Sequence, residues 1–437
     1  MSFLSLKQLL QFSTLPSENL SNENSLSLTS LSSASSTQVS SNIDLLRQIL
    51  VCLPVKSLLK FKSISKEWLS IISSQDFIRD HYLVRNRSFP LVPRLFILQV
   101  TVGFSPKSSK IKSYYGRQPS GIIPFKTFVF FLHERKFSKS SAAFETLAFN
   151  NDPSDIKIIH SCNGLFICRS YRTYYGDFNY DVYNPSTKCF KPLHPSPFRK
   201  SSVLKRICSV NMVFDPLRSN YYEVIFIWSS NDGDTFQIET YSSKTGSWRL
   251  HRDGFSAPVN MFCSPAGVFW NGSLHWINRE CSLYFNASQE SLKTMPSPPI
   301  PADGFDSKKV KCEYFGACNG HMYFVEVHHS NPTQFDILEM DIDYTGWTVK
   351  YHVDLQELAI AYPKMVRADY DFSILLIEED DVSSNILINI PDKIISYDLK
   401  EMSFKKLHDL PSIPTGGAQV TAPRYSAYRY DESLACV

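Results

Sequence analysis

Between residues 42 and 80, apolar residues recur at the spacing of one face of a helix. The first stripe, separated by steps of one, three or four positions, contains Leu45, Leu46, Ile49, Leu50 and Leu53. This spacing predicts an amphipathic helix, which Pro54 ends because its ring disfavours helical backbone at the preceding residue. Asn42 or Ser41 is a suitable cap, and Asp44 lies in the first turn.

Two further stripes predict two further helices. Val55, Leu58 and Leu59 form one, and a longer one spans 64–72 with Trp68 at its centre. Three helices in about forty residues cannot bury all of this apolar surface by themselves. Each large apolar side chain left in water forgoes about 1.5–3 kcal/mol. The pattern therefore predicts that one face of the module docks on a partner.

After about residue 90, helical periodicity gives way to short strands with turn signals. Asn-Gly pairs lie at the centre of three such segments, 162–166, 270–276 and 318–323. Asn-Gly flanked by apolar residues is a strong signal for a β-hairpin with a two-residue turn. The sequence therefore predicts an all-β region here.

A second unit consists of an apolar strand, a turn rich in Asn, Asp and Ser, and then a large apolar residue. Its leading residues are Tyr183, Tyr241, Phe285, Met340 and Tyr397. They recur about every 50 residues, the period of a kelch-like propeller blade. The length from 90 to 437 predicts an irregular kelch-like β-propeller of about six or seven blades. An irregular two-sheet β structure is the alternative.

Residues 1–41 differ in composition from everything that follows. They are rich in Ser, Asn and Thr, with Lys7 as the one basic residue. Such a segment buries too little apolar surface to offset its ordering entropy, and we expect it to be disordered. A plastid transit peptide is the alternative, although the lack of Arg disfavours it. The expected domains are thus a disordered tail at 1–41, a helical module at 42–82 and a β-propeller at 83–437.

Composition and charge narrow the classes of partner and compartment. The 45 basic and 42 acidic residues nearly balance, so we expect neither nucleic acid nor membrane as a partner. The ten cysteines include no Cys-x-x-Cys pair, which favours reduced thiols in the core. We find no stretch long enough for a signal peptide or a membrane span. These features predict a cytoplasmic or nuclear protein.

Asp341–Thr345 matches the Asp-x-Asp-x-Thr pattern of haloacid-dehalogenase phosphatases. That chemistry needs Mg²⁺ and a doubly wound parallel sheet, whereas this motif occupies a turn of the β repeat. The same stretch begins like a calcium loop, but its twelfth position is His352 rather than Glu. We therefore predict no enzyme activity here and no metal.

Two other polar groups are candidates for a binding site. His328 and His329 are adjacent, with Glu326 nearby. Neighbours on a strand point to opposite faces, so the two histidines are not predicted to chelate a metal together. The four acids at 378–381 predict a solvated loop, because like charges repel; attraction of a basic target is the alternative. Nothing in the sequence predicts a catalytic residue or a cofactor.

The residue order of 44–68 resembles an F-box of the plant type. The resemblance rests on Leu-Pro-Val-Lys-Ser-Leu-Leu at 53–59, on Ser-Lys-x-Trp at 65–68 and on Asp76-Phe77. The segments at 183–187, 214–216, 244–249 and 271–276 resemble the F-box-associated, kelch-like region of the same family. Together these resemblances cover about 42–437. On periodicity alone, the helices would equally suit a bundle packed on the β domain.

The resemblance implies that the module binds the Skp adaptor and, through it, a cullin scaffold of a ubiquitin ligase. The residues carried over for adaptor contact are Leu46, Ile49, Leu50, Leu53, Pro54, Val55, Leu58 and Phe61. Trp68 is expected to pack within the module. Ser41-Asn42 stands where the family usually has Leu-Pro, and Gln48 where Glu is usual, which predicts weaker adaptor affinity.

The function implied by this resemblance is target recognition for a Skp–cullin–F-box E3 ubiquitin ligase. The protein itself would be a non-catalytic subunit whose β domain binds a target protein of unknown identity. Loops at one mouth of the propeller are expected to bind that target, with 171–175 and 425–430 as aromatic candidates. The alternative is a protein-binding propeller that works outside the ligase, with a degenerate F-box.

Overall fold

The computed structural model describes fourteen stretches of the chain, and every structural statement below concerns them. They are residues 43–85, 95–103, 125–133, 156–171, 178–199, 206–229, 235–251, 253–258, 261–262, 266–299, 310–366, 372–379, 383–410 and 424–437. The tail predicted at 1–41 lies outside them. The chain forms two compact units, Met1–Cys52 and Leu53–Val437, which are described separately.

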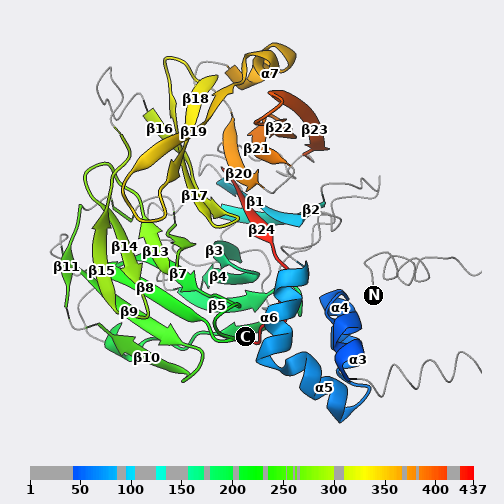
Figure 1. Ribbon diagram of the computed structural model, residues 1–437. Coiled ribbons are helices and arrows are strands. Elements are labelled where there is room, and N and C mark those ends of the chain that lie inside the picture. Colours follow the sequence, from blue (N-terminus) through cyan, green and yellow to red (C-terminus); the bar gives the residue numbers. More distant parts are fainter. Residues whose placement is uncertain are drawn as a thin grey trace, which may run out of the picture. The chain divides into compact units, whose positions relative to one another are not determined.

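The first unit contributes one described helix, and the second begins with three. Helix α3 spans Ile43–Leu50, and helices α4, α5 and α6 span Val55–Phe61, Lys66–Ser73 and Gln75–Leu83 (Figure 1). Pro54 lies immediately before α4 in extended conformation, with φ −60°. The chain thus interrupts the helical pattern at this proline, as the sequence predicted.

The prediction of three helices was wrong, because 43–83 contains four in the described structure. Ser74 separates α5 from α6 without any Pro or Gly. It ends α5, and its Oγ accepts a hydrogen bond from Phe77 N at 3.3 Å to cap α6. Ser65 caps α5 in the same way, accepting from Trp68 N at 3.1 Å. Each serine satisfies a backbone donor that the first helical turn leaves unpaired.

Twenty of the strands that follow form five four-stranded meanders, each built from strands consecutive in the chain, and one short further strand adds to the second of these sheets. In the first sheet, β3–β6 span Lys157–Cys162, Leu165–Tyr171, Phe178–Asn184 and Cys189–Pro192. In the second, β7–β10 span Arg206–Val213, Glu223–Ser229, Thr235–Ser242 and Ser247–Leu250, and β11 (Phe255–Ser256) pairs with β9. In the third, β12–β15 span Val268–Trp270, Ser273–Trp276, Ser282–Asn286 and Ser291–Met295.

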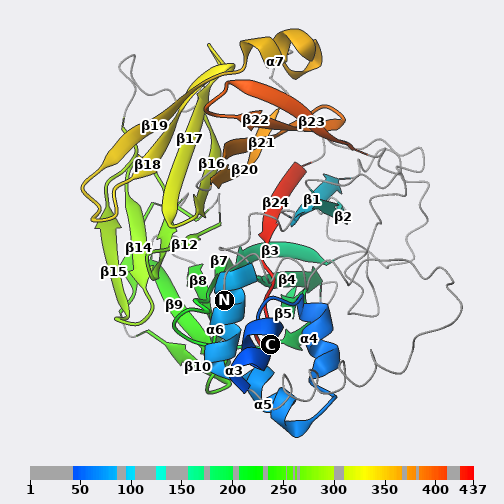
Figure 2. The same cartoon turned by 45° about the vertical axis from the view of Figure 1, so that its right-hand side comes forward.

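The fourth and fifth sheets complete the series. Strands β16–β19 span Val310–Cys318, His321–His328, Gln334–Met340 and Trp347–Asp354. Strands β20–β23 span Ser373–Glu379, Ser384–Ile390, Lys393–Asp398 and Ser403–Asp409. The short helices η5 (Pro197–Arg199), α7 (Gln356–Ala361) and η6 (Pro363–Val366) lie in connections between sheets. Figure 2 shows the sheets following one another around a common centre.

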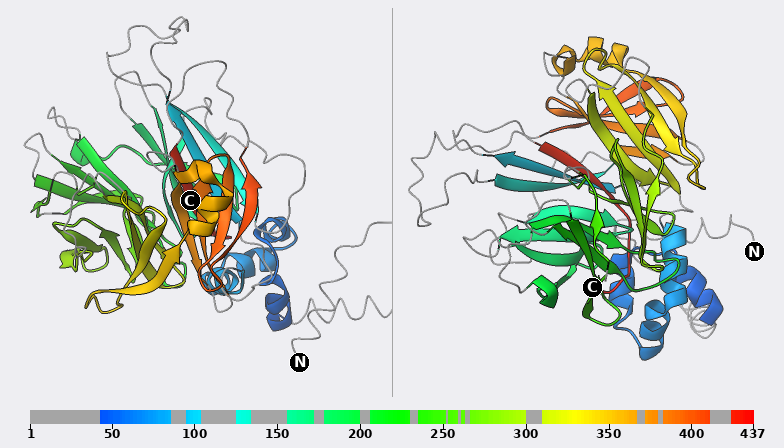
Figure 3. Two further views of the ribbon diagram at one scale, coloured as in Figure 1. Left: turned by 90° about the horizontal axis from the view of Figure 1, so that it is seen from above. Right: turned by 90° about the vertical axis from the view of Figure 1, so that its left-hand side faces the viewer.

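The first strand of each sheet lies innermost, next to the first strand of a neighbouring sheet. Contacts join β3 to β7, β12 to β16 and β16 to β20. A smaller sheet unites strands from the two ends of this region, which are β1 (Leu95–Gly103), β2 (Phe125–His133) and β24 (Arg424–Tyr430). Their order in the sheet is β2-β1-β24. Strand β24 packs beside β20 (Figure 3). Tyr428 OH donates to Ile158 O of β3 at 3.1 Å. This sheet thus lies between the last blade and the first.

The predicted β-propeller is confirmed, but the predicted number of six or seven blades was wrong. The described residues form five four-stranded blades. The estimate divided the length of the region by the repeat period. That division fails because the described part of 83–156 contributes two long strands that join the small sheet with β24, and because the connections between blades are long.

Both repeated turn motifs occupy one position per blade. Asn-Gly forms the two-residue turn between the first and second strands in three blades, where Cys162, Trp270 and Cys318 pair with the residue beyond the turn. All six Asn and Gly residues of these turns have positive φ, between 45° and 87°. The type I′ geometry of such hairpins demands this conformation.

The five units of the second motif form the turn between the third and fourth strands of the five blades. In several of these turns, the Asn or Asp that directly follows the leading residue accepts hydrogen bonds from backbone N–H groups of the turn. Asn184 Oδ1 accepts from Ser186 N at 2.9 Å, and Asp398 Oδ1 accepts from Lys400 N at 2.9 Å. The predicted repeat is thus a structural one, and its five copies give the correct number of blades.

The apolar core lies between neighbouring blades rather than in one central mass. One cluster joins the first two blades around Phe214, Val224 and Phe226. A larger one joins the fourth and fifth blades and includes Val325, Ile337 and Ile388, each with no exposed surface. Each pair of consecutive blades thus buries its facing surfaces together, which makes this region a stable platform for the outer turns and loops.

Candidate functional site

Helix α3 carries two apolar stripes of different exposure. Leu46 and Leu50, four positions apart, retain only 4% and 1% of their surface. Ile43, Leu45 and Ile49 retain 51%, 37% and 37%. Large apolar side chains this exposed lose hydrophobic stabilisation unless another surface covers them. The exposed stripe of α3 is therefore a candidate docking surface.

In the second unit, the residues predicted for adaptor contact divide in the same way. Val55 and Leu58 of α4 are buried, with 2% and 0% of their surface exposed. Leu53 and Phe61 are half-buried, and Pro54 is exposed. The structure thus leaves Ile49, Leu53, Pro54 and Phe61 accessible among the eight predicted residues. The other four are buried in this conformation.

Sequence reasoning missed several accessible apolar residues. Leu45 and Ile43 lie beside predicted residues on α3, while Ile64 and Leu69 flank the start of α5 with 58% and 46% exposure. Part of the signal was present in the sequence, because Leu45 and Ile64 belong to the predicted stripes, whereas Ile43 and Leu69 lie outside them. Periodicity marks the apolar side of a helix but does not say which half of a broad stripe stays exposed.

Trp68 and Phe61 meet edge to face, with ring centroids 5.3 Å apart and planes at 88°. This geometry is favourable for aromatic pairs. It joins α4 to α5 and matches the packing role expected of Trp68. The pair also leaves Phe61 half-buried, so that one side of its ring remains accessible.

His81 fixes the segment before α4 from inside the second unit. Its Nε2–H donates to the Leu53 carbonyl at 2.9 Å, and its ring stacks on Phe77. Burial lowers the pKa of His81 below the usual 6.5 despite the opposing effect of that hydrogen bond. A neutral histidine thus anchors the backbone of the predicted adaptor-contact residue Leu53.

The Asp341–Thr345 motif forms a structural turn between antiparallel strands β18 and β19. Thr345 Oγ1 lies 2.8 Å from Asp341 Oδ2 and 3.0 Å from Asp343 Oδ1, so the threonine hydroxyl is shared by both carboxylates. Tyr344 stacks on Tyr284 of the preceding blade, with centroids 4.6 Å apart. The motif joins two blades in an antiparallel setting that differs from the phosphatase fold.

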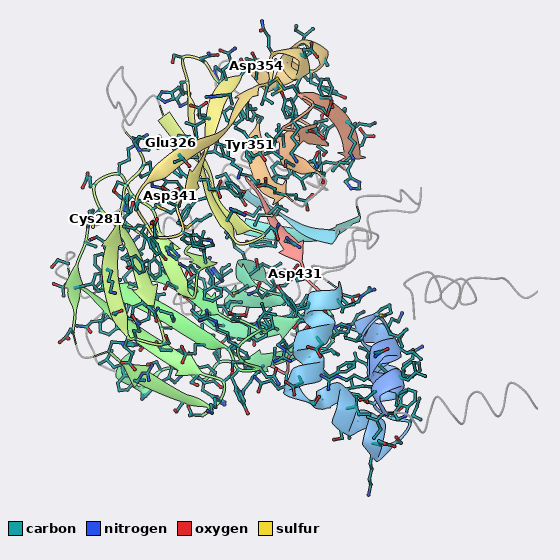
Figure 4. All side chains as sticks on the ribbon, viewed as in Figure 1. Cys281, Glu326, Asp341, Tyr351, Asp354 and Asp431 are labelled. Carbon is teal, nitrogen blue, oxygen red and sulfur yellow. The ribbon has the colours of Figure 1, made fainter. Side chains whose placement is uncertain are left out.

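Glu326, near His328 and His329 in the sequence, is engaged in an ion pair. Its carboxylate accepts from Arg279 Nε at 3.0 Å, and both side chains are 14% exposed. Figure 4 labels Glu326 on the fourth blade. Within the described part of the chain, no three His, Cys, Asp or Glu side chains form a group suited to a metal ion.

The prediction of a solvated loop at 378–381 was wrong for its first two residues. Glu378 and Glu379 end strand β20, and Glu378 is 6% exposed. Glu379 accepts hydrogen bonds from the hydroxyls of Tyr323 and Tyr351, the latter at 2.7 Å. Burial alone would raise the pKa of Glu379, but the two hydrogen bonds and the nearby Lys350 together lower it. Hydroxyl donors from the fourth blade thus replace part of the water that the half-buried Glu379 carboxylate loses. Residues 380–381 lie outside the described structure.

The aromatic segments predicted to bind a target have different placements. Tyr171 ends β4, while residues 172–175 lie outside the described structure. Tyr425–Tyr430 lie in β24, paired with β1 in the small closing sheet. Tyr428 packs against Phe166 of the first blade. This segment therefore has a structural role in joining the last strand to the first blade.

The described cysteines are free thiols, as the sequence predicted. Cys162, Cys168 and Cys318 are buried, whereas Cys189 and Cys436 are exposed, so only part of the set is packed in the core. Burial raises the pKa of the Cys162 and Cys168 thiols. None of the helices that the structure describes is long and apolar enough to cross a membrane.

Comparison with known families assigns both parts of the chain. Residues 42–80 match the F-box domain, and residues 125–318 match the F-box associated beta propeller domain. The first match covers all four described helices except the end of α6. The second covers the first three blades and reaches into the fourth.

The chain is also similar to plant proteins named as F-box proteins. The chain is 30% identical over 432 residues to the F-box protein At5g07610 of Arabidopsis thaliana, covering 92% of each chain. It is 25% identical to the putative F-box/kelch-repeat protein At1g12870 of the same plant, covering 62% of this chain and 61% of the relative. Its likeness to the solved SapL1 lectin has 10% identity, covers 66% and 94% of the two chains and has a TM-score of 0.37, too low to support an argument.

The first relative extends along nearly the whole chain, and the domain matches agree with the helices and blades in the structure. This chain is therefore a plant F-box protein that carries an F-box associated β-propeller domain.

Proposed function

We propose that this protein is the target-recognition subunit of a Skp–cullin–F-box ubiquitin ligase, in which the F-box binds the Skp adaptor and the propeller binds the target. The observation that carries the proposal is the exposed apolar stripe of α3, within a segment that matches the F-box domain. A folded protein gains by covering such a stripe, and the F-box family implies the adaptor as its cover.

The proposed adaptor contacts follow from exposure. Leu45 and Ile49 of α3, with Leu53, Pro54 and Phe61, are accessible in their respective units and are assigned to direct contact. The four buried predicted residues, Leu46, Leu50, Val55 and Leu58, are assigned a supporting role. Ser41-Asn42 and Gln48, where the family differs, are expected to weaken the contact without abolishing it.

The mechanism is proximity rather than chemistry. Holding a target close to the ubiquitin-charged conjugating enzyme raises the local concentration of its lysines. We assign no catalytic residue and no cofactor to this chain. The cytosol or nucleus is the proposed location, which imaging of a fluorescent fusion in plant cells tests directly.

Capture of the purified Skp adaptor by the full chain tests the adaptor contact. The variant Leu45→Asp with Ile49→Asp places charges on the exposed stripe and should reduce capture at least tenfold. Ile360→Asp is the matched control, because Ile360 of α7 is 72% exposed and lies in the propeller; its capture should equal that of the native chain.

Two results would overturn the ligase assignment: no capture by the native chain, or equal capture by both variants. Either would favour a propeller that binds proteins outside the ligase through a degenerate F-box. If capture behaves as expected, the Leu45→Asp, Ile49→Asp variant can be used to capture the target protein. Its partners in plant extract should include the target, which it holds without delivering it for modification.

A further inference from the structure

The end of helix α6 is joined to the propeller by side chains that the F-box assignment does not explain. Tyr82, only 5% exposed, donates from its hydroxyl to Asn163 Oδ1 at 2.9 Å. Asn163 begins the Asn-Gly turn of the first blade, and its Nδ2 donates to Phe214 O at 2.7 Å. Tyr82 thus contacts a side chain that is already fixed between the first two blades.

The last seven residues of the chain meet α6 at the same place. Arg85, just beyond α6, forms an ion pair with Glu432 at 2.9 Å. The two side chains are only 14% and 21% exposed. Partial burial reduces screening by solvent, so this pair is stronger than most surface pairs. Figure 4 labels the neighbouring Asp431 where the chain leaves β24 beside α6.

The C-terminal segment Asp431–Val437 is itself held by the first blade. Asn184 Nδ2 donates to the carbonyls of Ser433 and Ala435 at 3.0 and 2.9 Å, and Ser433 N donates to Ser186 Oγ at 3.0 Å. A Cβ on Gly164 would lie 2.6 Å from Asp431 O. The segment therefore runs directly beneath the Asn-Gly turn, and the glycine makes room for it.

A third contact lies at the other end of α6. Gln75 Nε2 donates to Arg218 O, in the connection between β7 and β8, at 3.3 Å. At 1.5 Å per helical residue, Gln75 and Arg85 are about 15 Å apart along the axis. Contacts at both ends of a helix, to three separate parts of the propeller, restrict its rotation as well as its position. A flexible tether would restrict neither.

We propose that Tyr82, Arg85 and the segment Asp431–Val437 form a clamp that holds the propeller in one orientation relative to α4–α6. Its purpose rests on the proposed ligase function: a target on the propeller would then be presented at a constant position. Proximity raises the rate of transfer most when the reacting groups are held in a narrow range of geometries. The clamp thus makes the C-terminal segment part of the positioning of the target.

Distance measurement by pulsed electron paramagnetic resonance tests the clamp in the full chain without any ligase component. Spin labels attached to a ketone-bearing unnatural residue at Glu67 of α5 and Glu401 of the last blade avoid the native cysteines. Both positions are exposed and lie in the same compact unit. The native chain should give one narrow distance distribution.

Arg85→Glu combined with Tyr82→Phe should at least double the width of that distribution. Adding Glu432→Arg restores an ion pair of opposite polarity and should narrow it again. Arg249→Glu with Tyr397→Phe is the matched control, because it removes a 2.8 Å ion pair and a 2.8 Å tyrosine hydrogen bond within the propeller. The control should keep the native width.

A broad distribution in the native chain, or a narrow one in the clamp variant, would overturn the proposal. A thermal melt shows whether the clamp variant is still folded. If it is unfolded, the variant that also carries Glu432→Arg is measured instead. A folded chain with a broad distance distribution in that variant would also overturn the proposal. In a reconstituted ligase, mapping of self-modified lysines should give a few sites in the native chain and a wider spread in the clamp variant. Failure of adaptor capture would end the ligase assignment but leave the distance result intact.

Discussion

The F-box helix α3 and the propeller strand β8 have similar residues but bury them very differently. Ile225 and Ile227 of β8 have no exposed surface, while Ile43 and Ile49 of α3 retain 51% and 37%. The strand lies inside a sheet whose two faces are covered by neighbouring blades. The helix exposes a stripe that its own unit does not cover.

This difference separates two kinds of stability. Burial between blades makes the propeller self-sufficient, because each sheet covers its neighbours. The exposed stripe of α3 contributes little hydrophobic stabilisation to the folded chain. When a partner covers it, its burial contributes to the free energy of binding instead. The comparison therefore assigns folding to the blades and recognition of the adaptor to the helix.

Acid should lower the stability of the propeller because it protonates His160. Its Nε2–H donates to Gly267 O at 2.7 Å, and its Nδ1 accepts from Met212 N at 3.3 Å, so the neutral ring joins three blades. Burial lowers the pKa of His160 from 6.5 to about 4. A shift of that size corresponds to about 3 kcal/mol of stability. The unfolded chain takes up the proton first, so this stability is present above pH 6.5 and is lost as the pH falls towards 4.

Urea unfolding from pH 8 to pH 4 measures this effect. His160→Asn should lower stability at pH 8 and flatten the loss between pH 6.5 and 4. His275, whose pKa is also lowered to about 4 by burial, should preserve part of that loss. His352→Asn is the control, because its side chain is 81% exposed. If stability fell with pH as steeply in the His160 variant as in the native chain, His160 would not be a neutral histidine that joins blades.

Two glycines in the same turn position should respond differently to alanine. Gly164 and Gly320 have φ of 87° and 86°, a conformation that costs L-residues about 1–2 kcal/mol. A Cβ on Gly164 would also lie 2.6 Å from Asp431 O, whereas nothing lies within 4 Å of one on Gly320. Gly164→Ala should therefore cost about 3 kcal/mol and Gly320→Ala about 1 kcal/mol. Equal losses in urea unfolding would show that the C-terminal segment yields without cost.

Sequence reasoning succeeded where the signal was local. Asn-Gly demands positive φ at two consecutive residues, so Asn163-Gly164 could be assigned as a turn from two letters alone. The five strand-turn units were found for the same reason, since an Asn or Asp that caps its own turn leaves a short, readable pattern. These features located the five blades without stating which face each residue would occupy.

It failed where distant parts of the chain decide. Dividing length by period counted 83–156 as ordinary blades, although β1 pairs with β24 from the other end of the chain and β2 pairs with β1 in the same sheet. Glu379 looked solvated because its hydroxyl partners, Tyr323 and Tyr351, are far away in sequence. Helix α6 was missed because Ser74, rather than a Pro or a Gly, separates it from α5. At the candidate site, periodicity found the apolar stripe but not its exposed half.

The smallest change in stability should accompany the clearest change in binding. Ile49→Ala removes a side chain that is already 37% exposed, and we expect it to cost less than about 0.5 kcal/mol in urea unfolding. Ile227→Ala removes a fully buried one and should cost about 2–5 kcal/mol. Adaptor capture should show the reverse order, weakened at least threefold by Ile49→Ala and unchanged by Ile227→Ala while the chain remains folded. If Ile49→Ala destabilised the chain as much as Ile227→Ala, the exposed stripe would belong to folding, and the division between the two regions would not hold.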